Sequence, residues 1–165
     1  MEMLYLLNDS ALRQLLSRAD KDLQEAEKFK FQRLHQWRKE VVPDFPGVYA
    51  LYEKVDSNYV LLYIGETGNL RERMSDICRT INHTFRGKLG HHRFQATKIK
   101  GKFESAIENL LNNFFDESLY ASFLQVNFGR TEIESFLVTK YQAILLNSES
   151  KRKLHIESDE LNEDQ

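Results

Sequence analysis

Apolar residues near the N-terminus recur with the period of an α-helix. Over residues 10–40 they follow one another at steps of four and three, at Leu12, Leu16, Ala19, Leu23 and Ala26. This spacing lines one face of a helix, and Asp9 or Ser10 would cap its start. The stripe blurs near Phe31 and resumes at Leu34, so the pattern leaves open one bent helix or two.

Two runs rich in Val, Tyr and Leu come after Pro46, over about residues 47–53 and 59–64. β-Branched and aromatic residues favour strands, and the polar segment at 55–58 between the runs is typical of a turn. The pattern therefore predicts a β-hairpin. A third strand is expected over 122–128, where Phe and Val alternate with Gln and Asn.

Three further helices are expected along the rest of the chain. The first directly follows the hairpin, is capped by Thr67 or Asn69, and has one apolar face made of Leu70, Met74, Ile77 and Ile81. The second covers 103–115, and the last opens at Thr131 with one apolar side made of Ile133, Leu137, Tyr141 and Ile144. Residues 82–102 contain three glycines and many basic residues without a clear period, which predicts a loop with short helical turns.

Together these elements predict an α/β fold of the α+β kind, with a small, three-stranded, mostly antiparallel sheet flanked by helices. We expect an N-terminal helical extension over residues 1–44, one domain over 45–148 and an acidic, solvated tail over 149–165. The apolar stripe of the extension has two interpretations. It packs against its own domain, or it pairs with another helix in self-association.

Composition excludes several classes of protein. Hydrophobic residues make up 41% and aromatic residues 12% of the 165 residues, which is enough for a packed core and unlike a disordered chain. No apolar run approaches the ~20 residues that a membrane span needs. The single cysteine, Cys78, has no intramolecular disulfide partner, so we expect a soluble protein of the cytoplasm or another reducing intracellular compartment.

Positive charge is concentrated in one part of the chain. The formal net charge is −2, yet residues 66–102 contain nine Lys or Arg and three acidic residues, a local excess of six positive charges. Such a segment is typical of contact with phosphates. The residues that we expect to bind nucleic acid are Arg71, Arg86, Lys88 and Arg93, with Lys98 and Lys100 on the same track. Each of them is equally explained as an ordinary basic surface residue.

Four motifs, in order along the chain, resemble the GIY-YIG nuclease superfamily. They are GVY at 47–49, YIG at 63–65, GETGNLRER at 65–73 and ESFLVTKYQAILLN at 134–147. The resemblance extends from about Phe45 to Asn147. It implies a divalent-metal-dependent endonuclease that hydrolyses phosphodiester bonds, with nucleic acid, chiefly double-stranded DNA, as its partner and Mg²⁺ or Mn²⁺ as its cofactor.

The resemblance also implies a role for each site residue. Tyr49 assists the attacking water. Tyr63 and Arg73 hold the phosphate, and Glu134 holds the metal. Independently, pairing within the hairpin would bring both phenols to one face of the sheet. On a helical wheel Arg73 falls about 40° from Ile77, at the margin of the buried face, where a guanidinium could clamp a phosphate.

Two of these assignments have alternatives. Thr131 and Glu134 form a T-x-x-E capping box, which would occur at the start of any stable helix, and Glu132 is the alternative metal ligand. The histidine that some family members carry one turn after Arg73 is absent, and His83 is the candidate substitute as a proton carrier.

Other features are weaker. Asn147 matches the asparagine that often closes the family domain, which places it at the site margin, whereas Ala143 stands where many relatives have proline. His91, His92 and Cys78 match no standard zinc spacing. The alternatives to a nuclease are a catalytically inactive nucleic-acid-binding module on the same fold and a protein-interaction module based on the N-terminal helical stripe.

Overall fold

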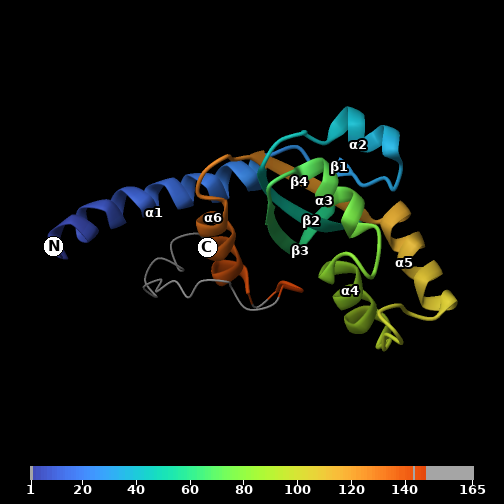
Figure 1. Cartoon of the computed structure of the whole chain (residues 1–165). Helices are drawn as coiled ribbons and strands as arrows, with labels where there is room; N and C mark the ends of the chain where they lie inside the picture. Colours follow the sequence, from blue (N-terminus) through green and yellow to red (C-terminus); the bar gives the residue numbers. More distant parts are fainter. Residues whose placement is uncertain (1, 143, 148–165) are drawn as a thin grey trace.

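The computed structural model describes residues 2–142 and 144–147, with side chains from residue 10 onward. The prediction of an α+β fold with an N-terminal helix is confirmed (Figure 1). In chain order the elements are α1 (Glu2–Glu25), β1 (Phe29–Lys30), α2 (His35–Val41), β2 (Gly47–Val55), β3 (Asn58–Thr67), α3 (Leu70–Ile77), α4 (Thr84–Phe94), α5 (Ser105–Glu117), β4 (Leu119–Gln125) and α6 (Arg130–Tyr141).

The sheet has four antiparallel strands in the order β1-β4-β2-β3, which leaves β3 at one edge. β2 and β3 form the predicted hairpin. The predicted third strand is β4, which begins at Leu119 rather than residue 122. The expected number of three strands is wrong because β1 pairs Phe29 with Ala121 and Lys30 with Tyr120. A strand of two residues is too short to show a strand period in the sequence.

Helices cover both faces of the sheet. Alternate residues of β2 point to opposite sides: Val48, Ala50 and Tyr52 pack with α1 and α6, whereas Tyr49 and Leu51 pack with helices α2 to α5. Figure 1 shows α1 and α6 on one side and α3, α4 and α5 on the other. Because both faces are covered, the first six residues of β2 are all buried. The GVY motif of β2 therefore lies inside the molecule.

The N-terminal segment consists of two helices separated by β1. α1 begins at Glu2, so neither Asp9 nor Ser10 is its cap. Leu16, Ala19 and Leu23 are buried, and α1 packs on α6 and β4, which supports the interpretation that the stripe serves its own domain. The predicted self-association stays a prediction.

A buried charge also fixes α1 to the domain. Asp20 accepts hydrogen bonds from Lys140 Nζ at 2.8 Å and from the Tyr141 hydroxyl at 3.0 Å. Both partners lie at the end of α6. The far half of α1 extends beyond the sheet and its covering helices (Figure 1).

The predicted loop over 82–102 is wrong in its first half, which forms the eleven-residue helix α4. Its buried face consists of Phe85, Arg86, Gly87, Leu89 and Gly90, and three of these residues are not apolar side chains. The apolar period is therefore hidden. Conversely, α3 ends at Ile77, and Ile81, expected on its apolar face, is 61% exposed.

Two expectations concern residues that the structure does not describe, namely the departure at Ala143 and the solvated tail over 149–165. The boundary predicted at residue 44 is untested, although β1 brings part of the expected extension into the sheet. None of the helices in the described part of the chain combines the length and apolar character that crossing a bilayer requires.

Candidate active site

Two buried tyrosines from the hairpin lie side by side on one face of the sheet. Tyr49 of β2 is opposite Gly65 of β3, and Leu51 is opposite Tyr63, so the phenols come from neighbouring positions. Their rings stack with centroids 6.3 Å apart and planes 22° apart. Only 1% of Tyr49 and 9% of Tyr63 is exposed. Strand pairing alone therefore places both phenols in one small region.

Gly65 provides the space that the Tyr49 ring occupies. A Cβ atom at this position would lie 2.3 Å from both Cζ and Oη of Tyr49, far inside van der Waals contact. The glycine of the YIG triplet is therefore needed for close packing against the phenol. Sequence reasoning did not assign Gly65 to the site, although its place opposite Tyr49 in the hairpin was the available signal.

We expect Gly65→Ala to lower any catalytic rate that depends on Tyr49 by about 10²-fold, because the added methyl must displace the phenol by an ångström or more. The matched control is Gly68→Ala, since a Cβ at Gly68 meets no atom within 4 Å. Rates should be compared after circular dichroism has shown that both variants are folded. Equal rates for the two variants would contradict the role given to Gly65.

His83 joins the tyrosines from the N-terminus of α4. Its Nε2 lies 3.0 Å from the Tyr49 hydroxyl, and its Nδ1 accepts a hydrogen bond from the Phe85 backbone N–H at 3.0 Å. Because Nδ1 accepts, a neutral imidazole must carry its proton on Nε2. His83 therefore donates to the Tyr49 oxygen. The Tyr63 ring also meets the imidazole edge to face, with centroids 5.4 Å apart.

Burial and the nearby positive charge of Arg73 lower the pKa of His83 to about 4, so the imidazole is neutral at physiological pH. Burial has the opposite effect on the phenol. It raises the pKa of Tyr49 well above 10, reinforced by Tyr63, and only the charge of Arg73 opposes this shift. The resting site therefore holds a neutral histidine donating to a protonated tyrosine.

His83 should make the fold sensitive to mild acid. The unfolded chain binds a proton near pH 6.5 and the folded chain near pH 4, so stability from this residue is complete above pH 6.5 and is lost as the pH falls through 4. The difference corresponds to about 3 kcal/mol. Urea unfolding of wild type and His83→Asn between pH 7 and 4 measures it, because asparagine keeps the N-cap but does not titrate. If the free energy of unfolding of wild type and of His83→Asn changed with pH in the same way, the lowered pKa of His83 would be refuted.

Arg73 of α3 is half-buried next to this pair. Its positive charge lowers the pKa of both Tyr49 and His83. Within residues 2–142 and 144–147 it makes no side-chain hydrogen bond or ion pair. A guanidinium that has no ion-pair partner among the described residues is suited to bind a phosphate.

Glu134 reaches the same region from α6. The helix begins at Arg130 after Gly129, so Glu134 is its fifth residue and lies beyond the first-turn N–H groups that a capping box would use. The capping interpretation is therefore wrong. Glu134 is 8% exposed, and its negative charge is one of those that raise the pKa of Tyr49. The charges of Arg73 and Glu134 thus both act on the Tyr49 phenol, in opposite directions.

Two contacts at the edge strand β3 hold the site together. Arg130 Nε binds Glu66 at 3.3 Å and ties the start of α6 to β3. Asn147 donates to the Ile64 carbonyl at 2.6 Å and accepts from the Ile64 N–H at 3.0 Å. The Asn147 side chain thereby satisfies both backbone groups of Ile64, as a neighbouring strand would. The Glu66–Arg130 pair left no sequence signal, whereas Asn147 was expected at the site margin.

Comparison with protein families matches residues 46–162 to the GIY-YIG catalytic domain. The match covers more than half of the chain and includes every residue described above. The chain belongs to the GIY-YIG catalytic domain family. Comparison with curated proteins and with solved structures gives no match. The GIY-YIG assignment supports a nuclease-type fold, and the site is the part of that fold where its two tyrosine motifs meet.

The donor set of this GIY-YIG site fits a hard divalent cation. Among the described residues no group of three or more His, Cys, Asp or Glu could hold a metal with protein ligands alone. Glu134 offers a buried carboxylate beside the phenols. One carboxylate suits Mg²⁺ or Mn²⁺, which bind oxygen and complete their coordination with water and substrate phosphate.

The four basic residues expected to bind nucleic acid differ in their surroundings. Arg71 donates to the backbone carbonyls of Arg38, Lys39 and Val42 and pairs with Asp44, so it closes the end of α2. Arg86 is 2% exposed and pairs with Glu108 at 2.7 Å. Arg86 is therefore buried within the fold, whereas Arg71 makes intramolecular contacts while its side chain stays 31% exposed.

The other two are nearer the surface. Arg93 binds both carboxylate oxygens of Glu53 at 3.1 and 2.5 Å. Lys88 is half-buried and lines a cavity beside α4, together with Lys98. Of the four residues, Lys88 is thus the one that lines this cavity.

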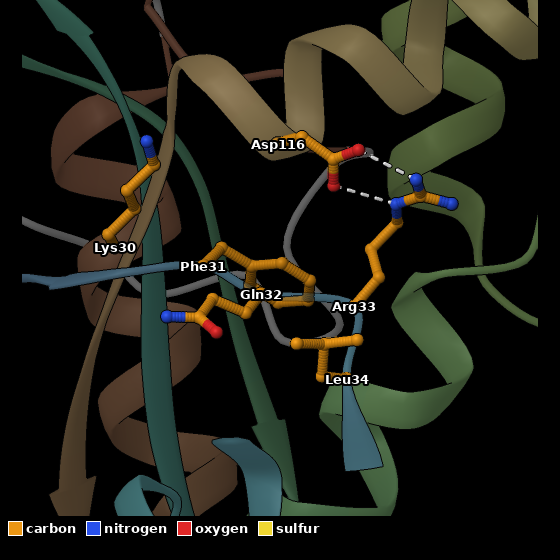
Figure 2. Close-up of a pocket in the computed structure, with 6 residues that line it drawn as sticks. All are labelled: Lys30, Phe31, Gln32, Arg33, Leu34 and Asp116. Carbon is orange, nitrogen blue, oxygen red and sulfur yellow. Dashed lines mark hydrogen bonds and ion pairs between the residues drawn. The ribbon is translucent and has the colours of Figure 1, made fainter. Parts of the chain in front are cut away.

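A second hollow lies at the β1 edge of the sheet, and none of the site residues lines it. Figure 2 shows its lining, in which Arg33 and Asp116 face each other. Both guanidinium contacts to the carboxylate are short, at 2.8 and 2.7 Å. The two charges satisfy each other, and Lys30 is the remaining charged residue of the lining. We assign no chemistry to this hollow.

Proposed function

We propose that this protein is a divalent-metal-dependent endonuclease that hydrolyses phosphodiester bonds in DNA. The observation that carries the proposal is the meeting of Tyr49, His83, Arg73 and Glu134 around one buried phenol. GIY-YIG nucleases act on nucleic acids and generally use divalent metals, which supports the same conclusion. The site combines a potential base, a cation for the phosphate and an oxygen ligand for a metal.

In the proposed mechanism Tyr49 takes a proton from the attacking water. The buried phenol holds its own proton at rest, so it can act as a base only after that proton has passed to bulk water. Two groups favour that loss: the positive charge of Arg73 and the Nε2–H of His83, which donates to the phenolate oxygen. His83 thus supports Tyr49 as a hydrogen-bond donor. This role differs from the expected one of a proton carrier.

The phosphate is held by Arg73 and Tyr63. The guanidinium offers paired N–H donors to the non-bridging oxygens, on which negative charge grows during attack. The Tyr63 hydroxyl, which lies 3.5 Å from Thr84 Oγ1, would donate a hydrogen bond to the same phosphate. Glu134 would hold the divalent cation, which supplies electrostatic stabilisation of the developing charge.

The test is cleavage of supercoiled plasmid, branched DNA and single-stranded DNA with Mg²⁺, Mn²⁺ or a chelator. We expect wild type to cut with metal only. Glu134→Gln keeps the shape of the side chain and removes its charge, so it should lose activity at limiting metal and recover part of it at high metal. Salt-sensitive binding by wild type without any cleavage would instead establish an inactive nucleic-acid-binding module.

A further inference from the structure

A cavity of about 550 Å³ opens along α4, next to the catalytic phenols. One side is built by Thr84, Gly87, Lys88 and His91, which recur at helical steps of three, one and three and share one face of α4. The opposite side is formed by Ala96, Thr97, Lys98 and Phe103 and by the segment Leu145–Asn147. The lining includes none of the five residues that have a role in the proposed reaction.

The cavity adjoins the candidate active site through two of its lining residues. Thr84 lines it and places its Oγ1 3.5 Å from the Tyr63 hydroxyl. Asn147 also lines it and is bonded to Ile64, between Tyr63 and Gly65. His83, the residue before α4, touches Tyr49. Lys88 follows Thr84 by one turn, about 6 Å along the helix. A DNA strand whose phosphate is bound at the tyrosines can therefore place its next nucleotide in this cavity.

The lining of the cavity combines apolar side chains with two lysines. Its apolar residues include Phe103, which is 6% exposed, with Leu145 and Leu146. Its lysines are Lys88 and Lys98, and the Lys98 ammonium lies close to Gly87, where a Cβ would be only 3.0 Å from Nζ. Burial lowers the pKa of Lys88, so its charge is partly desolvated and gains from an anionic neighbour.

We propose that this cavity receives an unpaired nucleotide adjoining the scissile phosphate, so that the protein prefers DNA with a single-stranded tail or an extruded base over fully paired duplex. The proposal rests on the proposed function. A flat base matches the apolar side chains of the lining and its phosphate matches the two lysines. A paired, stacked base cannot enter a concave site without leaving the helix, which costs a few kcal/mol, whereas an unpaired base enters at little cost.

Binding without metal tests the cavity separately from cleavage. We would measure fluorescence anisotropy of a labelled duplex with a short single-stranded tail and of the same duplex with blunt ends, in chelator. Stacking of one base contributes about 1–3 kcal/mol, so we expect wild type to bind the tailed duplex about tenfold more tightly. Gly87→Phe should abolish this preference by filling the cavity, while affinity for blunt duplex stays unchanged.

Gly87 is a suitable position because its backbone is not in the left-handed region and an added Cβ meets only the flexible end of Lys98. A second variant, Lys98→Ala, should weaken binding of tailed DNA more than of blunt DNA. Its matched control is Lys102→Ala, which removes the same charge from the same basic segment outside the cavity lining and should affect both DNAs equally.

The outcomes separate the two proposals. Equal affinity of wild type for tailed and blunt DNA, or a preference that survives in Gly87→Phe, would overturn the cavity proposal even if the protein cuts DNA. A preference that Gly87→Phe removes, in a protein that never cuts any DNA with metal, would keep the cavity and reject the nuclease.

Discussion

Replacement of Arg73 by alanine is expected to lower the rate of DNA cleavage by about 10²–10³-fold without unfolding the protein. Arg73 is the cation whose charge acts on both Tyr49 and His83. Its removal takes away the ligand of the phosphate and one of the two groups that favour loss of the Tyr49 proton. Loss of one preorganised donor to a developing negative charge typically has an effect of this size.

Single-turnover cleavage at saturating metal measures this effect. Arg73→Lys is the informative companion, because it keeps the charge and loses the planar pair of donors, and we expect an intermediate rate. Arg79→Ala, an exposed arginine just after α3, controls for the general loss of positive charge. Cleavage by Arg73→Ala at the rate of Arg79→Ala would remove Arg73 from the mechanism.

The sequence contained enough information to bring the two tyrosines together. Their positions follow from hairpin pairing, since Tyr49 faces Gly65 and Tyr63 faces Leu51 in the observed register. Arg73 followed from the helical wheel, because α3 buries Leu70, Met74 and Ile77 and leaves Arg73 at the margin. These are local periodicities, which a sequence displays directly.

Contacts between distant elements were not accessible in this way. The sequence left a capping box as the alternative to the metal-ligand role of Glu134, and only the structure, in which α6 begins at Arg130, argues against the capping box. His83 was proposed only to replace a missing family histidine, and its contact with Tyr49 depends on α4, a helix whose buried face includes an arginine and two glycines. From the sequence alone Arg86 was expected at the surface, because its partners Glu108 and Asn112 lie on another helix, α5.

That arginine gives the last prediction: Arg86→Ala should lower the free energy of unfolding by about 3 kcal/mol. Arg86 donates to Glu108 at 2.7 Å, to Asn112 at 2.8 Å and to Thr80 at 3.1 Å, and its guanidinium lies over the Phe115 ring. Burial alone would raise the pKa of Glu108, but hydrogen bonds from Arg86 and Thr80 outweigh it and hold that pKa below its usual value. Breaking one partner of a buried pair leaves the other uncompensated.

Urea unfolding at pH 7 checks this value, with Arg93→Ala as the matched control. Arg93 pairs with Glu53 near the surface, where its side chain is 40% exposed, so its loss should change stability by about 1 kcal/mol or less. If Arg86→Ala is as stable as wild type but binds DNA more weakly, Arg86 belongs to the nucleic-acid track after all. The expected result instead means that Arg86, one of the nine basic residues in 66–102, joins α4 to α5 and does not bind a phosphate.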